Sequence, residues 1–330
     1  MRPLLLVLPL LLASSARAEL QSPGSLLVFP FADARPGTTC VVTLTNVNPA
    51  AGQTLAVEVR SFVDCLETNR TYPLPSNDTL SFTMSQAFPA PGQGFLCAVA
   101  KDAFGRAVSA NHLIGSVLVL DGNLGLEFQI PAVAFASPLA EGAPTDIDGD
   151  DLRDLNGAEY ARAPDELLFP RFVGQSTTFR SELVLVNLTG GRAFTAVANL
   201  TIWNDDRDVF VAQHTFRCWS RVRLADASGA FSNSFLLSTG HNPSESVLGR
   251  ENGWFHVDGH VAYSSARTIA DPALLGALIE PASYSSASLP FGRGTQDNGD
   301  IYPTGVNGDG NGFPGNNGPV IPTHGGIFGG

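Results

Sequence analysis

The sequence contains almost no lysine. Lys101 is the only lysine among 330 residues, and lysine and arginine together number 19 against 31 aspartates and glutamates. The formal net charge is −12, and the basic residues form no cluster. Because nucleic acids and anionic membranes bind positively charged surfaces, this balance argues against both as partners. It is typical of an acidic protein that stays soluble outside the cell.

The sequence also lacks the short motifs of common enzyme classes. It contains no G-x-S-x-G elbow, no HExxH, no Walker loop and no GxGxxG directly after an expected strand. Each of these motifs places a nucleophile, a metal ligand or a phosphate-binding turn, so their absence removes the usual sequence indications of catalysis. We therefore expect a non-enzymatic protein.

Long hydrophobic segments are missing, and the longest apolar run lies at the N-terminus. Arg2 supplies a basic start, an apolar run extends from Leu4 to Leu12, and Ala16-Arg17-Ala18 has the small-x-small pattern of a cleavage site. The run is far shorter than the ~20 residues of a membrane span. Residues 1–18 are thus predicted to be a signal peptide. We expect a bacterial protein that is secreted or held at the cell surface, in the periplasm or outside the cell, without a membrane span.

Cysteine is scarce, and export permits its four copies to form disulfides. If the first half is an immunoglobulin-like sandwich, a Cys40–Cys97 bond would cross between its sheets, and a Cys65–Cys97 bond would join neighbouring strands. Cys218 is either free or bonded across the two halves. The sequence does not decide among these connectivities. Since no pair has CxxC spacing, metal binding by the thiols is not expected.

Residues 19–138 have the pattern of an all-β domain. In the segment 55–62, Leu55, Val57 and Val59 alternate with Glu58 and Arg60, which is the period of a half-buried strand. About seven such segments, separated by turn residues, predict an immunoglobulin-like antiparallel β-sandwich. They cover residues 26–31, 40–45, 55–62, 79–84, 94–100, 113–119 and 132–136.

Residues 164–282 repeat this order and predict a second β-sandwich that arose by internal duplication. Matching segments recur at offsets of 140, 141, 141 and 144 residues, and a nearly constant offset is typical of a duplicated unit. The pairs are 166–170 with 26–30, 182–187 with 41–46, 198–205 with 57–64, and 259–263 with 115–119.

The C-terminal residues 283–330 have a different composition, rich in glycine, asparagine and proline. Such a segment has too few apolar side chains to offset the entropy lost on ordering. The sequence therefore predicts a disordered, flexible tail.

An acidic connector, residues 139–163, joins the two predicted sandwiches. Within it, the segment 146–154 carries aspartates at positions one, three, five and nine. Calcium takes about six to eight oxygen ligands, and alternating acids on a tight loop direct their oxygens to one point. The sequence predicts a Ca²⁺ site whose ligands are Asp146, Asp148, Asp150, the backbone carbonyl of Leu152, and Asp154.

This loop departs from an EF-hand in two places. Asp151 occupies the sixth position, where calcium loops place glycine, and Gly157 occupies the twelfth, where an EF-hand places a bidentate glutamate; Glu159 follows two residues later. A shorter loop of the thrombospondin type-3 kind fits better, and a solvated acidic linker is the alternative. A cation here is expected to fix the angle between the halves, so that its removal loosens their arrangement.

A second metal hypothesis concerns His256, Asp258 and His260. On a strand, these three side chains would share one face, as ligands of zinc or a similar metal in an enzyme. The alternative is an exposed strand face with ordinary polar residues. No fourth ligand is recognisable nearby.

Two other patterns have a structural and a functional interpretation. The acids of segment 205–208 are expected to form a hairpin turn, with a second cation site as the alternative. Trp203, Trp219 and Trp254 could form a stacking platform for sugars, although aromatic side chains in a sandwich more often belong to the core.

Four short motifs together resemble a group of uncharacterised secreted bacterial proteins with tandem β-sandwich halves. They are Phe169-Pro170, Phe216-Arg-Cys-Trp219, Val257-Asp-Gly259 and Ala273-Leu-Leu-Gly276. The resemblance covers most of residues 24–281. It implies the fold and export but no activity.

Together these features predict a secreted, non-enzymatic protein with a structural or adhesive role and a calcium-stiffened connector. The expected partner is an extracellular or cell-surface protein or a polysaccharide. The alternatives are a carbohydrate-binding module or accessory protein of an extracellular hydrolase and, more remotely, a metal-dependent enzyme.

Overall fold

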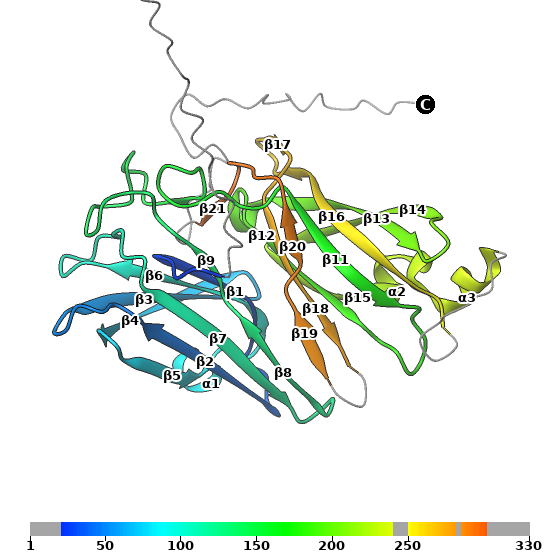
Figure 1. The fold of residues 1–330 in the computed structure, drawn as a ribbon, viewed down its shortest axis with the longest axis horizontal. Coiled ribbons are helices and arrows are strands. Elements are labelled where there is room, and N and C mark those ends of the chain that lie inside the picture. The colour runs from blue at the N-terminus through cyan, green and yellow to red at the C-terminus, as the bar shows by residue number, and fades with distance from the viewer. Residues whose placement is uncertain (1–20, 240–249, 282–284, 302–330) are drawn as a thin grey trace, which may run out of the picture.

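The computed structural model describes residues 21–239, 250–281 and 285–301. Their regular structure consists mainly of antiparallel strands, with a few single-turn helices (Figure 1). The predicted all-β class is therefore confirmed. None of the helices in these ranges is long and apolar enough to cross a membrane. The predicted signal peptide and residues 302–330 of the predicted tail lie outside the described ranges.

The first half is a sandwich of two antiparallel sheets, with alternate side chains of each strand packed between them. One sheet has the order β5-β2-β7-β8, formed by Thr79–Thr83, Thr38–Asn46, Leu113–Asp121 and Leu126–Pro131. The other has the order β4-β3-β6-β1-β9, formed by Leu66–Pro75, Thr54–Val63, Gln93–Lys101, Leu26–Asp33 and Val133–Phe135. A helical turn, α1 (Met84–Ala87), follows β5.

The second half is one long sheet that folds over on itself. Its order is β19-β18-β12-β15-β14-β13-β16-β11-β20, with β17 added beside β16. The fold-over occurs between β14 and β15, which share a single pair, Arg217 with Trp219. A core of residues from both arms fills the space between them. The strands are Glu166–Val173 (β11), Glu182–Asn187 (β12), Thr195–Asn204 (β13), Val209–Arg217 (β14), Trp219–Arg223 (β15), Asn252–Tyr263 (β16), Thr268–Ala270 (β17), Leu274–Glu280 (β18), Ser286–Ser288 (β19) and Phe291–Arg293 (β20).

Apart from the added β17 and the single β14–β15 pair, the strand pairing of the two halves is the same, as the predicted internal duplication requires. β1 pairs with β6 and β9, as β11 pairs with β16 and β20. β2 pairs with β5 and β7, and its counterpart β12 pairs with β15 and β18. β3 pairs with β4 and β6, and its counterpart β13 pairs with β14 and β16. The pairing register of β1 shifts after Phe29 and that of β11 after Phe169, directly before a proline in both. Proline cannot donate to a ladder, so it imposes the same irregularity twice.

One of the four matched segment pairs is wrong. Residues 259–263 belong to β16, which corresponds to β6, whereas residues 115–119 belong to β7, which corresponds to β18. Between β15 and β16 the second half carries additional chain that includes the short helices α2 (Leu224–Ala227) and α3 (Asn233–Leu236). After this insertion the offset between equivalent residues of the two halves is no longer about 141. The false match arose because residues 259–263 of β16 have a glycine followed by mainly apolar residues, as residues 115–119 of β7 do.

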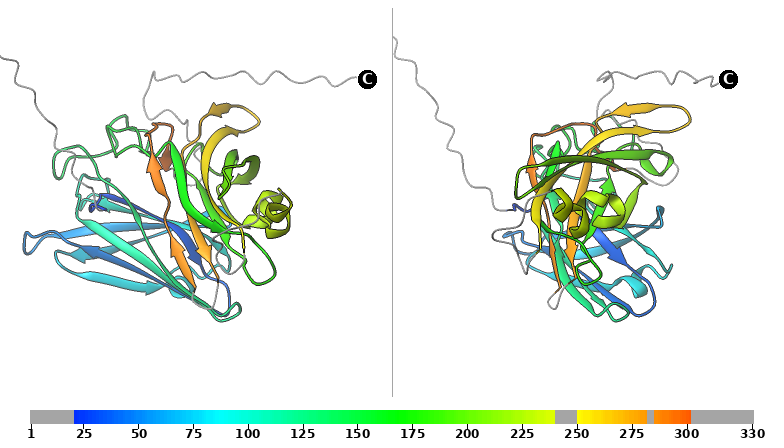
Figure 2. Two further views of the ribbon diagram at one scale, coloured as in Figure 1. Left: turned by 45° about the vertical axis from the view of Figure 1, so that its right-hand side comes forward. Right: turned by 90° about the vertical axis from the view of Figure 1, so that its right-hand side faces the viewer.

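The two halves are packed tightly against one another (Figure 2). Every residue of β1 is buried: Leu27 and Phe29 point into the first core, and Leu26 and Val28 point into a junction cluster that contains Val186 of the second half. Side chains of β12 and β18 also extend the first core. At the edge of the junction, the indole Nε1 of Trp219 donates to the carbonyl of Pro30 at 2.9 Å. The halves therefore form one body.

The connector and part of the predicted tail are ordered. Leu155, Tyr160 and Ala163 of the connector are fully buried in the junction cluster, and β10 (Arg153–Asp154) pairs with β21 (Asp300–Ile301). The prediction of a flexible tail is wrong for residues 285–301, because these residues add β19 and β20 to sheet edges and β21 to the connector. Backbone pairing orders them, together with the packing of Leu289 against the first core and of Ile301 in the junction cluster.

A disulfide joins Cys65 to Cys218, so it crosses between the two halves. Both bonds considered within the first half are therefore wrong, and Cys40 and Cys97 are free and buried. The reason is geometric: Cys40 points into the first core, whereas Cys97 points from the opposite face of its sheet into the junction cluster.

Thiol counting tests this arrangement. Unreduced protein, unfolded in denaturant, should expose two titratable thiols, those of Cys40 and Cys97, and reduction should add those of Cys65 and Cys218. A Cys65→Ser, Cys218→Ser variant should give the same number of thiols before and after reduction. Any increase in that variant would show that Cys40 and Cys97 are bonded.

Candidate metal centre

The acidic loop begins where the connector leaves the first half. The backbone N–H of Thr145 donates to the carbonyl of Ala107 at 3.0 Å, and the buried hydroxyls of Thr145 and Tyr160 are hydrogen-bonded at 2.7 Å. The chain then makes a series of tight turns before it enters β10. Both ends of the loop are thus fixed to the packed body of the protein.

The aspartates themselves produce the turns. Asp146 Oδ1 accepts from the N–H of Gly149 at 2.9 Å, and Asp150 Oδ1 accepts from the N–H of Leu152 at 2.8 Å. Short acidic side chains favour such local bonds to the backbone. As a result, one carboxylate oxygen each from Asp146, Asp148 and Asp150 lies within 4.8 Å of the others. The structure therefore brings together three of the predicted ligands.

The sixth loop position adopts the backbone shape that calcium loops assign to glycine. Asp151 has a φ of 65°, in the left-handed region that aspartate tolerates better than most residues. Its carboxylate accepts from Nη2 of Arg153 at 3.1 Å. The same guanidinium donates to the carbonyl of Leu152. That carbonyl, a predicted ligand, is therefore already engaged by one hydrogen bond.

Glu159 ties the start of the loop to its end. Its Oε1 accepts from the N–H of Ile147 at 2.6 Å and its Oε2 from the N–H of Asp154 at 3.1 Å. The side chain is buried. Burial, together with the charges of Asp148 and Asp146, raises the pKa of Glu159 to about 7, against the opposing effect of the two backbone donors. Glu159 thus does not act as the bidentate ligand that an EF-hand has at its twelfth position. It stabilises the loop by accepting hydrogen bonds from the loop backbone.

Asp154 is an acidic side chain whose ionised form is poorly stabilised by its surroundings. It is 1 % exposed, and its Oδ1 is buried without a hydrogen-bond donor. In the β10–β21 pair it lies opposite Asp300, which is also fully buried. Burial, followed by the charges of Glu159 and Asp300, raises the pKa of Asp154 to about 9. The charges of Asp150 and Asp148 raise this pKa further. Asp154 itself is not among the carboxylates that lie within 4.8 Å of one another.

The possible metal ligands of this site are all carboxylate oxygens. Three clustered carboxylates suit a hard cation such as Ca²⁺ and do not suit zinc, which prefers nitrogen and sulfur. Sequence reasoning found the three clustered acids by their spacing. It did not find Asp300, because only the pairing of β21 with β10 brings that residue close.

The second predicted metal set is not assembled. Between Val197 and Ala198 the register of the β13–β16 pair shifts, so that His260 becomes an extra residue in a bulge. The expected alternation ends there, and His260 is exposed. Among the described residues, the groups of metal-ligating atoms that lie within 4.8 Å of one another include neither histidine. Asp258 lies instead with Asp165 and Asp271.

The three tryptophans are separated into two environments. Trp203 and Trp254 stack across β13 and β16, with ring centroids 4.0 Å apart and an interplanar angle of 3°. Trp219 packs 6.0 Å from Phe31 at the junction. The platform of three is therefore reduced to a pair, which lies half-buried on the outer face of the β14-β13-β16 sheet.

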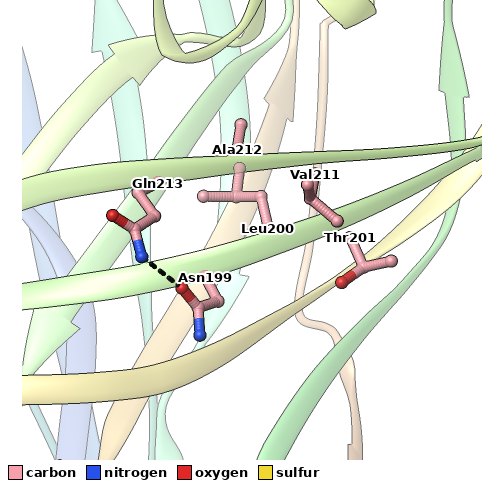
Figure 3. Close-up of a pocket in the computed structure, with 6 residues that line it drawn as sticks. All are labelled: Asn199, Leu200, Thr201, Val211, Ala212 and Gln213. Atoms are coloured by element: carbon pink, nitrogen blue, oxygen red, sulfur yellow. Dashed lines mark hydrogen bonds between the residues drawn. The ribbon is translucent and has the colours of Figure 1, made fainter.

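An open hollow of about 540 Å³ lies on the same β13–β14 hairpin. Figure 3 shows its lining: Asn199 and Gln213 are joined by a hydrogen bond of 3.0 Å, and Thr201 lies near Val211. Val211 is 79 % exposed. The outer face thus combines aromatic, aliphatic and amide side chains.

Comparisons of the chain with protein-family models, with curated proteins and with solved structures find no match. The resemblance to secreted bacterial tandem-sandwich proteins therefore stays a prediction.

The support that Glu159 gives to the loop can be measured. Replacing it with glutamine (Glu159→Gln) removes one acceptor and leaves one backbone N–H without its partner. In the presence of chelator, the free energy of unfolding should fall by about 1–3 kcal/mol in urea titrations. Glu141→Gln, an exposed change in the same connector, is the matched control and should have little effect. Equal stability of the two variants would contradict the role assigned to Glu159.

Proposed function

We propose that this chain is a secreted or cell-surface, non-enzymatic protein with a structural or adhesive role, and that its connector is stiffened by Ca²⁺ bound at the Asp146–Asp154 loop. The observation that carries the cation is the cluster of Asp146, Asp148 and Asp150, together with the buried Asp154 at the end of the same loop, whose Oδ1 has no hydrogen-bond donor. A buried carboxylate without a partner costs several kcal/mol, unless a cation or a proton neutralises it.

The supporting observations for a structural role come from the junction. The halves share an apolar cluster and a disulfide, and such cross-links persist in oxidising compartments. An acidic chain with a formal net charge of −12 suits attachment to an extracellular or cell-surface protein or a polysaccharide, not to nucleic acid. The bacterial signal peptide predicted over residues 1–18 points to the same location.

The role of the cation differs from the expectation based on the sequence. The angle between the halves is fixed by apolar packing and by the disulfide. Calcium would therefore not set this angle. It would neutralise the negative charges of the acidic side chains in the connector, and so hold β10 and β21 against the junction.

Calorimetric titration tests the calcium loop. Metal-free protein should bind Ca²⁺ with measurable heat, and Asp148→Asn combined with Asp150→Asn should remove the binding at this loop. Calcium should also raise the unfolding temperature of the unmodified chain, because a ligand that binds only the folded state stabilises it.

Small-angle scattering provides the control for the role of the cation. The profiles with calcium and with chelator should superimpose, since the junction does not depend on the cation. A chain that binds no calcium at this loop would refute the site, and a change of overall shape on chelation would refute its confinement to the connector.

Carbohydrate binding, by the protein itself or as an accessory to an extracellular hydrolase, is the second candidate function. The observation that favours it is the Trp203–Trp254 stack beside the β13–β14 hollow. In the first half the equivalent pair, Phe62 and Phe95, stacks at 4.5 Å inside the junction, where it is covered by the second half. The tryptophan pair occupies the corresponding face, which no described part of the chain covers in the same way. Aromatic rings flanked by amide and hydroxyl groups are suited to stack on sugars.

A glycan array or polysaccharide pull-down tests this second function. Trp254→Ala should reduce the affinity of any bound glycan by about tenfold, or about 1.4 kcal/mol. Tyr263→Ala removes an exposed aromatic ring of the same strand, away from the stacked pair, and should leave the affinity unchanged. The absence of glycan binding, or equal affinities of both variants, would exclude the tryptophan face.

A further inference from the structure

A second group of carboxylates lies at the far end of β13, where the hairpin turns into β14. Asp205 and Asp206 follow the last residue of β13, and Glu251 immediately precedes β16. One oxygen from each of the three carboxylates lies within 4.8 Å of the others. Two members are adjacent in the sequence, and the third comes from a different segment.

Glu251 is the unusual member of this group. Its relative exposure is 0 %, and neither Oε1 nor Oε2 has a hydrogen-bond donor. Its backbone is satisfied, because its N–H donates to Asn233 Oδ1 at 3.2 Å and its carbonyl accepts from Gly174 at 2.7 Å. The segment is thus held in place while the carboxylate points toward two other acids. Native proteins rarely leave a buried charged group without partners.

Among the described residues, no positively charged side chain is paired with Glu251. The guanidinium of Arg250 is directed elsewhere: it donates to the carbonyl of Gly174 and to Thr178, and it covers the ring of Phe179 with a centroid distance of 4.8 Å. Within the described ranges, the ion pairs of the chain involve neither Glu251 nor Asp205. Burial, followed by contact with Asp205, raises the pKa of Glu251 to about 7.

We propose that Asp205, Asp206 and Glu251 form a second divalent-cation site of the calcium type. Three carboxylates supply oxygen ligands only, which is the donor set of a hard cation. The cation would pair with the buried Glu251 and would clamp the β13–β14 turn to the first residues of β16. Because Trp203 and Trp254 precede and follow the ligands in these same strands, the clamp lies beside the stacked tryptophans. The site is independent of the Asp146–Asp154 loop.

The position of the tryptophans provides a readout specific to this site. Terbium(III) binds to calcium sites through the same oxygen ligands and emits when it receives energy from a nearby tryptophan. In the whole protein, tryptophan excitation should produce terbium emission, and added Ca²⁺ should displace it. Glu251→Gln should abolish this emission, and so should Asp206→Asn, an exposed change in the turn that leaves the core intact.

Three comparisons decide the outcome. Asp226→Asn, the same charge change at an exposed position in the second half, should retain the emission. The Asp148→Asn, Asp150→Asn variant should also retain it, which separates this proposal from the calcium loop. Trp203→Phe with Trp254→Phe should lose the emission but retain calcium binding in calorimetry.

The proposal is overturned if the unmodified protein gives no calcium-displaceable emission, since Glu251 and Asp205 would then share a proton instead of a cation. It is also overturned if Glu251→Gln and Asp206→Asn emit like the unmodified chain. Unfolding of Glu251→Gln is not expected, because glutamine has the same shape and can donate to Asp205. The metal-free variant should unfold at or above the temperature of the metal-free parent, and calcium should raise that temperature less in the variant than in the parent.

Discussion

The burial of β1 on both faces is the constraint on which the rest of the structure depends. Leu27 and Phe29 complete the first core, while Leu26 and Val28 complete the junction with the second half. A strand with apolar side chains on both faces must lie between two layers. The second half therefore acts as a cover for the first, and the connector, which runs through the same cluster, has no freedom to behave as a linker.

The two halves share their strand pairing but use the same face differently. In the first half, the sheet that contains β1 presents the Phe62–Phe95 stack to the junction. In the second half, the corresponding sheet presents Trp203 and Trp254 on the outside, bordered by the exposed Val209 and Val211. A head-to-tail arrangement of repeats always leaves one such face without its partner. This is the physical reason that binding by the second half is a natural candidate function.

Local sequence patterns predicted those features of the structure that depend on interactions between residues close together in the chain. Alternation located β3 as a strand, but the prediction that it is half-buried is wrong, because Glu58 and Arg60 are buried as well. The aspartates at residues 146–150 predicted a tight acidic loop because their side chains bond to the nearby backbone. Alternation failed for β4, a polar edge strand, and for β19–β21, which are too short to show a period and are placed by their pairing with other strands. The Cys65–Cys218 bond spans 153 residues, and Glu251 meets Asp205 only through the β13–β16 pairing. No local signal encodes such contacts.

The disulfide has a consequence for proteolysis. Its two cysteines lie on opposite sides of the connector in the sequence, so every peptide bond between residues 65 and 218 belongs to a covalent ring. A single cleavage within that ring, including one in the acidic loop, leaves both fragments attached and the apolar junction intact. Wherever proteases are present, such a chain survives a nick as one particle and separates only after reduction.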